Sequence, residues 1–348
     1  MPSNPPVIAI VGPTGTGKSE LALDLAQKIG NCEIINADAF AQYRGMDIGT
    51  AKQLPHEQRG IPHHLIDVLD TLEVSTIAQY QQAARIAVSR VLARGATPIV
   101  VGGSGLYVRA LLDEMALPGS DAAIRADFQR RLAAEGIESL YAELAANDGE
   151  AAAKIDPHNA RRIIRALEVI AITGKPYAAS LPSAKYVYPT SIQIGLDFAR
   201  SALDERIEKR VAKMRAQHLL SEVRGLASPA QGGTGPGLGE TAARAIGYAE
   251  LLPVLRGEVG EAAAFEQIVA NTRRLTRKQM GWFGRDPRIT WLDGATPHLA
   301  DNALTAIDQA ICHPIAPSDQ RAGVISPQRV PLGSISAMVS SMWIYPYI

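Results

Sequence analysis

Residues 7–19 constrain the fold more than any other stretch of this chain. The apolar run Val7-Ile8-Ala9-Ile10-Val11 is followed at once by Gly12-Pro13-Thr14-Gly15-Thr16-Gly17-Lys18-Ser19. The run predicts a buried strand, and the apolar residues that come after it predict a helix. The turn between them fits G-x-x-x-x-G-K-[ST], in which backbone N–H groups converge on phosphate oxygens at a helix N-terminus. The sequence therefore predicts a di- or triphosphate site, with an ordinary glycine-rich turn as the alternative.

The side chains that end this motif predict how the phosphates are held. Lys18 would place its ammonium group on the terminal phosphates, and Ser19 would offer its hydroxyl to Mg²⁺. Mg²⁺ is the one cofactor that the sequence predicts.

Composition limits the class of protein without selecting a ligand. The 348 residues allow one large or two modest domains, and 47% hydrophobic against 20% charged residues suits a soluble globular chain. Lys+Arg and Asp+Glu are both 35, so RNA binding has to be judged from local charge. Cys32 and Cys312 form no metal or disulfide pattern, which indicates a reducing cytoplasm. No run of 18 apolar residues occurs, so we expect no membrane contact.

Further strand-to-loop junctions predict an α/β fold. The apolar segment 33–38 ends on Asp38, and the segment 98–101 leads into Gly102-Gly103-Ser104-Gly105. Because the carboxyl ends of parallel strands face the ligand crevice, we expect Asp38 and the Ser104 hydroxyl beside the phosphates. A capping or loop aspartate is the alternative for Asp38. The predicted fold is a P-loop NTPase-like parallel sheet, flanked by helices and carrying an inserted helical module.

Changes in amino-acid composition along the chain predict four segments. Residues 1–115 would form the first part of the core, and the Ala-, Glu- and Arg-rich residues 116–185 a helical insertion. Residues 186–315 would complete the core. Residues 316–348, rich in Ser and Pro, would be a disordered tail.

Two basic segments predict contact with a nucleic acid. Arg161, Arg162 and Arg165 lie within five residues of one predicted helix. The second segment, 271–288, carries six cations against one acid, with Trp282 and Phe283 between them. Basic charge interleaved with aromatic rings is typical of RNA binding. A solvated helix face, or a helix covering the edge of a core, is the alternative for each segment.

Several motifs together resemble one family. They are the run from Gly12 to Ser19; Asn36-Ala37-Asp38; Tyr43-Arg44-Gly45-Met46-Asp47-Ile48-Gly49-Thr50-Ala51-Lys52; Gly102-Gly103-Ser104-Gly105-Leu106-Tyr107; Arg165-Ala166-Leu167-Glu168-Val169; Ile246-Gly247-Tyr248; and the basic segment that ends at Trp282. With these motifs the chain resembles the bacterial tRNA dimethylallyltransferase (tRNA isopentenyltransferase) family over nearly everything but the tail. The run from Tyr43 to Lys52 is highly specific, since ordinary P-loop kinases do not carry it.

The resemblance implies a reaction and roles for residues. Dimethylallyl diphosphate would give its five-carbon group to the exocyclic amine of the adenine 3′ of the anticodon, in tRNAs reading U-initial codons, and diphosphate would leave. Asp38 would act as general base, while Ser104 and Arg210 would join Lys18, Ser19 and Mg²⁺ in neutralising the diphosphate. The expected partners are the tRNA anticodon stem-loop and dimethylallyl diphosphate. The protein is expected to be a monomer.

The resemblance also implies a set of tRNA contacts. These are Asp38, Ala39, Phe40, Ala41, Ser104, Arg125, Arg161, Arg162, Ile163, Ile164, Arg165, Arg244, Tyr248, Arg277, Lys278, Gln279 and Trp282. The chain departs from the family where Ser usually follows the aspartate and Gln stands two residues further on. Ala39 and Ala41 occupy these positions, so the target adenine would be recognised by Gln42 or by backbone groups.

Three other functions remain open from the sequence. A small-molecule kinase would use the same phosphate loop, but the run 43–52 argues against it. An adenylate isopentenyltransferase would use a free nucleotide, and the basic segment 271–288 argues for RNA instead. An RNA-binding protein without activity is suggested by Ala39 and Ala41, whereas Asp38, Lys18 and Ser19 argue against it.

Overall fold

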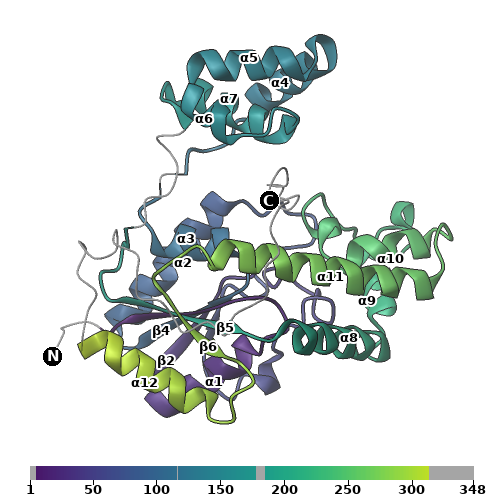
Figure 1. Cartoon of the computed structure of the whole chain (residues 1–348). Helices are drawn as coiled ribbons and strands as arrows, with labels where there is room; N and C mark the ends of the chain where they lie inside the picture. Colours follow the sequence, from purple (N-terminus) through teal and green to yellow (C-terminus); the bar gives the residue numbers. More distant parts are fainter. Residues whose placement is uncertain (1–4, 116, 178–184, 313–348) are drawn as a thin grey trace. The chain divides into compact units, whose positions relative to one another are not determined.

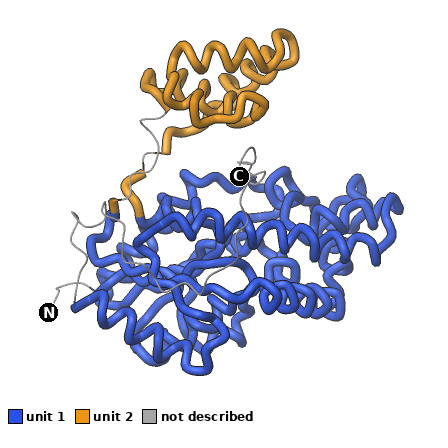
Figure 2. The backbone as a smooth tube through the Cα atoms, viewed as in Figure 1, with its two compact units in different colours: residues 1–112, 186–323 blue, residues 113–185, 324–348 orange. Residues whose placement is uncertain are grey.

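The computed structural model describes residues 5–115, 117–177 and 185–312. This part of the chain divides into two compact units: unit 1 holds the residues before 113 and from 186 onward, and unit 2 holds residues 113–185 (Figure 2). The sequence placed the helical insertion at 116–185, close to the bounds of unit 2. The predicted tail, 316–348, lies outside the described residues.

Unit 1 contains a sheet and its covering helices (Figure 1). Its strands are β1 (Val7–Val11), β2 (Cys32–Asn36), β3 (His63–His64), β4 (Thr97–Gly102), β5 (Ser191–Asp197) and β6 (Ile289–Asp293). Its helices are α1 (Lys18–Ile29), α2 (Ile77–Ala93), α3 (Gly105–Leu112), α8 (Arg200–Ala216), α9 (Leu219–Leu226), α10 (Tyr248–Leu255), α11 (Glu261–Phe283) and α12 (Leu299–Cys312), with short 3₁₀ turns η1 (Pro55–Glu57), η3 (Pro229–Gln231) and η4 (Ala242–Arg244).

The sheet is parallel throughout and confirms the predicted fold class. Its strand order is β3-β2-β4-β1-β5-β6, and β1 lies between β4 and β5, with Ile8 in register with Ile99 and Ile192. The inner strands β1 and β4 are buried along their whole length, which explains why their sequences are nearly continuous apolar runs rather than alternating ones. The carboxyl ends of β1, β2 and β4 therefore meet at one edge, where the phosphate loop begins.

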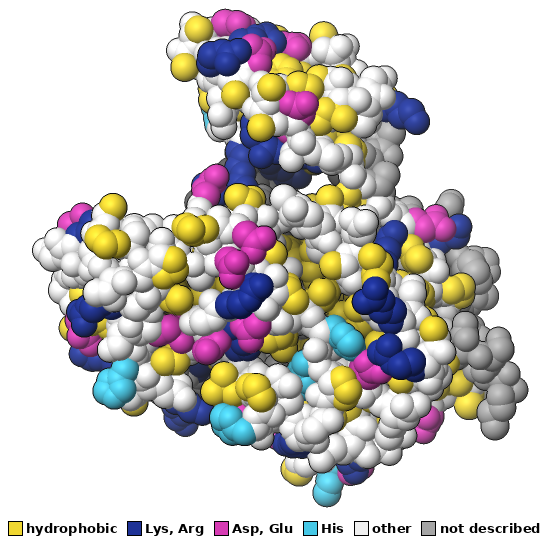
Figure 3. Space-filling view, turned by 180° about the vertical axis from the view of Figure 1, so that it is seen from behind, with side chains coloured by type: hydrophobic (Ala, Val, Ile, Leu, Met, Phe, Trp, Pro, Cys, Tyr) yellow, Lys and Arg dark blue, Asp and Glu magenta, His cyan; other side chains and the backbone are white. Residues whose placement is uncertain are grey.

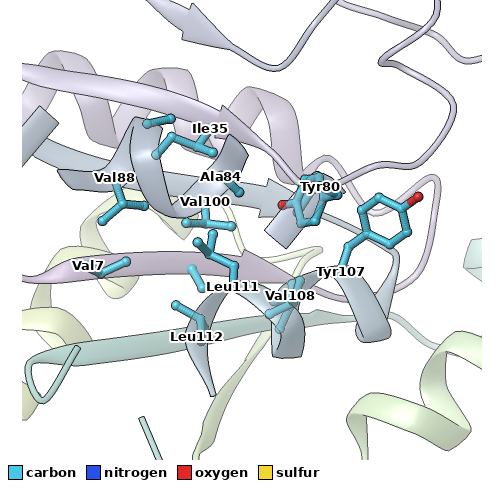
Figure 4. Close-up of a cluster of buried hydrophobic side chains, with 14 of the residues drawn as sticks. Val7, Ile35, Tyr80, Ala84, Val88, Val100, Tyr107, Val108, Leu111 and Leu112 are labelled. Carbon is cyan, nitrogen blue, oxygen red and sulfur yellow. The ribbon is translucent and has the colours of Figure 1, made fainter. Parts of the chain in front are cut away.

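Alternate residues of β1 build two separate cores. Val7, Ala9 and Val11 pack with α2 and α3, including the rings of Tyr80 and Tyr107 (Figure 4). The residues between them, Ile8 and Ile10, face the opposite side, where α1 and α12 supply the apolar side chains. This is the two-residue alternation of a strand, so a helix layer covers each face of the sheet.

A third core lies beside the sheet and is built by α8, α9, α10 and the first part of α11. It also takes in Tyr43 and Met46 from the run 43–52. The glycine-rich segment 226–239, which composition predicts to be flexible, is instead closed by its own hydrogen bonds. Gln231 binds both backbone groups of Leu238 at 2.8 and 2.9 Å, and Gly235 donates to the Ala227 carbonyl at 2.7 Å.

Unit 2 is a bundle of α4 (Ala122–Glu135), α5 (Ile137–Asn147), α6 (Gly149–Lys154) and α7 (Ala160–Thr173). The Asn159 side chain caps α7 by accepting from the Arg162 N–H at 3.1 Å, and Gly174 ends the helix in the left-handed conformation. The two chain segments that enter and leave the insertion are joined where they meet unit 1. There the Val187 N–H donates to the Leu112 carbonyl at 2.7 Å.

None of the helices in the described ranges combines the length and the apolar character that crossing a bilayer requires.

The core beneath the phosphate loop provides a test of the fold. Ile10 is fully buried between β4 and β5, so the variant Ile10→Ala should lose about 2–5 kcal/mol of unfolding free energy, because it removes transfer energy and leaves a cavity. Ile86→Ala is the matched control, since Ile86 is 45% exposed on α2, and it should change stability by about 0.5 kcal/mol or less. Urea unfolding measures both values, and equal losses would contradict this description of the core.

Candidate functional site

The loop between β1 and α1 has the geometry that phosphate binding requires. Gly12 has a φ of 129°, and a Cβ there would lie 2.6 Å from the Leu196 carbonyl oxygen, so this position accepts glycine alone. Thr16 Oγ1 donates to the Pro13 carbonyl at 2.9 Å and closes the loop upon itself. The predicted strand–loop–helix arrangement is confirmed, and the first N–H groups of α1 lie at the end of the loop.

Two cations and one carboxylate meet at this loop. Lys18 is buried and donates to the Pro13 carbonyl at 2.5 Å. The pKa of Lys18 is lowered to about 7, mainly by burial and then by the charge of Arg210, while the charge of Asp38 opposes both effects. Burial also lowers the pKa of Arg210, and Asp38 again raises it. The three predicted groups are therefore brought into one electrostatic environment, which carries an excess of positive charge when Lys18 is protonated.

The Asp38 carboxylate lies just beyond the end of β2 and is fixed on one side only. Its Oδ1 accepts from the N–H groups of Phe40 at 2.9 Å and Ala41 at 3.4 Å, while the Asp38 N–H donates to Asn36 Oδ1 at 3.0 Å. These bonds form an Asx turn that orients the side chain. Oδ2 makes no hydrogen bond to any residue that the structure describes, so it can accept one from a ligand.

The residues after Asp38 point into the protein. Ala39 and Ala41 are almost completely buried, and Gln42 is 4% exposed. The Gln42 side chain donates to the Ala39 carbonyl at 3.1 Å and to Ser75 Oγ at 3.4 Å, and Ser75 Oγ in turn lies 3.0 Å from the Tyr107 hydroxyl. Gln42 thus belongs to a buried polar network, which leaves backbone groups as the alternative means of adenine recognition.

The second glycine junction, 102–105, is held against the phosphate loop by α11. Gln279 accepts from the Thr14 N–H at 2.9 Å and donates to the Gly103 carbonyl at 2.9 Å. Trp282 packs so closely on Gly105 that a Cβ at this glycine would lie 1.9 Å from its ring. Ser104 begins the turn into α3, and its hydroxyl makes no hydrogen bond within the described ranges.

The run 43–52 forms a braced loop next to the phosphate loop. Lys52 is buried and donates to the Tyr43 carbonyl and to the carboxylates of Asp47 and Asp67, at 2.5–2.7 Å. Glu222 on α9 accepts from three successive N–H groups, those of residues 47–49, at 2.8–3.2 Å.

The braced loop also holds a predicted catalytic residue. Arg210 Nη2 donates to the Thr50 carbonyl at 3.1 Å. A second arginine of α8, Arg206, donates to the Gly15 carbonyl of the phosphate loop at 2.8 Å. Because α8 contacts both loops, it fixes the position of Arg210 relative to Lys18.

The cations of α11 divide into two groups. Arg273 is paired with Glu208 of α8, and Arg288, just beyond the helix, is paired with Asp286. Arg277 and Lys278 have no ion-pair partner in the described part of the chain, and Arg277 is exposed. On the face of the molecule seen in Figure 3, cations and acids are interspersed. The two neighbouring cations Arg277 and Lys278, without an ion-pair partner among the described residues, favour phosphate contact at α11.

The arginines of unit 2 are partly engaged. Arg125 and Arg165 both bind Glu168, at 2.9 and 3.1 Å, and the Glu168 side chain is fully buried. Arg165 also donates to the Pro118 and Gly119 carbonyls. Two cations share one carboxylate and stay partly exposed, so this cluster keeps a positive surface.

Several predicted tRNA contacts have a packing role. Ile163 and Ile164 lie in the core of unit 2, Gln279 is 5% exposed, and Tyr248 is fully buried with its hydroxyl donating to Glu222 at 2.5 Å. Arg244 is partly exposed and is paired with Glu240. RNA contact by these side chains remains a prediction, and the structure explains their presence without it.

The phosphate loop offers an oxygen ligand that suits Mg²⁺, provided that a bound diphosphate supplies further oxygen ligands. Ser19 is exposed in the first turn of α1, and its hydroxyl makes no hydrogen bond with the described residues. No group of three or more His, Cys, Asp or Glu side chains in the described ranges could hold a metal alone. Mg²⁺ usually takes one or two protein oxygens together with phosphate oxygens, so a hydroxyl at this position suits it.

The parallel sheet and its glycine-rich loop define a P-loop fold with a phosphate-binding site. Residues 41–286 match the family model described as IPP transferase. The chain belongs to this family.

Named relatives and solved structures agree with that assignment. A tRNA dimethylallyltransferase of Bifidobacterium longum (strain NCC 2705) is 47% identical over 335 residues, 95% of this chain and 99% of the relative. One from Mycolicibacterium smegmatis is 50% identical, covering 85% of this chain and 96% of the relative.

The tRNA isopentenylpyrophosphate transferase of Bacillus halodurans has a TM-score of 0.63 and 32% identity, covering 88% of this chain and 98% of that one. A eukaryotic dimethylallyltransferase described as acting on tRNA has a TM-score of 0.73 and 26% identity, with coverage of 88% and 79%.

The lowered pKa of Lys18 predicts a pH dependence. Above pH 7 the free protein holds Lys18 neutral, so binding inorganic diphosphate requires uptake of a proton. Affinity should then fall as pH rises from 7 to 9, by up to about tenfold per unit. Lys18→Arg keeps its charge over this range and should show only the pH dependence of diphosphate itself. Titration calorimetry measures both, and parallel curves would contradict the role of Lys18.

Proposed function

We propose that this protein transfers a dimethylallyl group from dimethylallyl diphosphate to the exocyclic amine of the adenine 3′ of the anticodon, in tRNAs reading U-initial codons. The observation that carries the proposal is that Asp38 lies close to the two cations of the phosphate loop, Lys18 and Arg210. Its Oδ2 accepts no hydrogen bond from the described residues. The names of the relatives support the same substrates.

The proposed step moves one group and one proton. The amine nitrogen forms a bond to C1 of the dimethylallyl group, and the bond from C1 to the diphosphate oxygen breaks, with its electron pair leaving on diphosphate. Asp38 Oδ2 accepts the proton that the amine loses. Lys18, Arg210 and the N-terminus of α1 stabilise the charge that develops on the leaving diphosphate.

The remaining groups of the site complete this arrangement. The Ser104 hydroxyl, at the second glycine junction, is a donor toward the same anion. Ser19 would hold Mg²⁺, which supplies further charge neutralisation for diphosphate when bound. Because Ala39 and Ala41 carry no polar side chain, the adenine edge is recognised by backbone groups of the turn 38–41.

A base stacked in an RNA loop cannot reach a carboxylate at the edge of a sheet, so the target adenine has to leave its stack. Contacts to phosphates would position the anticodon stem-loop without reading its sequence. Arg277 and Lys278 of unit 1 and the cluster of Arg125 and Arg165 in unit 2 are the cations that suit this role.

The function is tested together with its general base. Purified protein, radiolabelled dimethylallyl diphosphate, Mg²⁺ and an anticodon stem-loop should yield labelled RNA. Asp38→Asn keeps an oxygen that can accept from the Phe40 N–H, yet it cannot take a proton, so turnover should fall by roughly 10²–10⁴-fold. RNA affinity should stay within a few-fold of the wild-type value.

Three results would contradict this assignment. Turnover of Asp38→Asn close to wild type would leave Asp38 a purely structural role. Phosphorylation of a small alcohol from ATP, without prenyl transfer, would place the protein among the kinases, and labelling of free adenylate in preference to RNA would exclude tRNA as the acceptor.

The outer cations of α11 should control the salt dependence of RNA binding. Arg277→Ala and Lys278→Ala should each weaken binding and reduce the slope of log affinity against log salt by about one unit. Substrate and non-substrate tRNAs should be affected alike, because phosphate contacts carry no sequence information. The control is Arg256→Ala, which removes an exposed arginine already paired with Glu258. Filter binding across a salt series would contradict the assignment if all three variants kept the wild-type slope.

A further inference from the structure

Gln279 connects α11 to both glycine junctions of the phosphate site. Its side chain is 5% exposed, and its two polar atoms are both used, one on the Thr14 N–H and the other on the Gly103 carbonyl. An amide is the side chain that accepts and donates at once, which matches these two backbone groups. Loss of Gln279 would leave a buried donor and a buried acceptor unpaired, which is costly.

The same helix presents cations on its outer side. Thr272, Thr276, Gln279 and Phe283 are buried and follow the spacing of one helix face. Arg277 and Lys278 immediately precede Gln279 and lie off that face. Because α11 is one continuous helix of 23 residues, a ligand that restrains its outer face also restrains the buried face that carries Gln279.

A second contact, one turn further along, gives α11 a defined seat. Trp282 lies against Gly105, the first residue of α3, with no space for a side chain between them. Gln279 and Trp282 thus hold the same part of α11 against the two glycine junctions, and any shift of the helix away from them would break both Gln279 bonds.

We infer that Gln279 is a positioning residue through which RNA bound on the outer face of α11 strengthens diphosphate binding in the phosphate loop. The inference rests on the proposed function, because it takes RNA as the ligand of α11. RNA that holds α11 in its seat keeps the Thr14 backbone in place, and diphosphate binds the loop in that conformation. Coupling between the two sites is then reciprocal.

The test measures binding without catalysis. The probe is inorganic diphosphate, and the RNA is an anticodon stem-loop whose target adenine is replaced by purine, which lacks the exocyclic amine. In the full-length wild-type protein, saturating RNA should tighten diphosphate binding by about fivefold or more. In Gln279→Met, which keeps the length of the side chain and removes its hydrogen bonds, RNA should change diphosphate affinity less than about twofold, because the path of the coupling is lost.

A matched control and a second readout separate coupling from stability. Gln267→Met alters an exposed glutamine of the same helix and should keep the wild-type coupling. Hydrogen exchange of the peptide that contains Thr14 should slow when RNA is added to wild type. Gln279→Glu keeps an acceptor for the Thr14 N–H but cannot donate to Gly103, and it should show weakened coupling even where Gln279→Met folds poorly.

The outcomes distinguish the inference from the proposed function. Wild-type protein that binds both probes and transfers the prenyl group, but shows no coupling, would overturn the inference alone. Full coupling in Gln279→Met or in Gln279→Glu would overturn it as well. Failure of the wild type to bind the stem-loop at all would overturn both.

Discussion

The burial of two basic side chains beside one carboxylate, at the carboxyl edge of the sheet, is the constraint on which the rest of the site depends. Lys18 and Arg210 interact with the charge of Asp38, and burial lowers the pKa of both basic groups. When Lys18 is protonated the charges of the three groups are not balanced, and a multiply charged anion is the ligand that would balance them. A leaving diphosphate has that charge, which is why the same arrangement that binds a substrate also stabilises the product of bond cleavage.

Keeping such groups in place requires supports that come from distant parts of the chain. Glu222 fixes the backbone of residues 47–49, and the Thr50 carbonyl then holds Arg210. Arg206 holds the phosphate loop at Gly15, and Gln279 holds it at Thr14. The loop is thus braced from α8 and from α11, and each brace ends on a backbone group rather than on another side chain. Such contacts fix the path of the chain directly, which preorganises the site.

The sequence predicted the elements whose signals are local. Apolar runs located the strands, and glycine spacing located the phosphate loop with Lys18. The family resemblance implies RNA contact for Gln279, and the hydrogen-bond partners that the structure gives this side chain lie 265 and 176 residues away, where no local pattern indicates them. Glu222 gave no signal for the same reason, since a carboxylate on a helix reads as solvated until the N–H groups of residues 47–49 are brought to it. The resemblance also implies RNA contact for Ile163 and Ile164, whereas their apolar side chains are buried in the core of unit 2, as is usual for isoleucine.

The point where the helical insertion joins unit 1 has an evolutionary consequence. Leu112 and Val187 are joined by a backbone hydrogen bond of 2.7 Å, so the chain leaves unit 1 and returns to it at almost the same point. A short turn could join these two residues without moving a strand of the sheet. The 74 residues between them, 113–186, can therefore be lengthened, exchanged or lost as a cassette, while the catalytic edge is inherited unchanged. The architecture lets the helical insertion change at a different pace from the phosphate site.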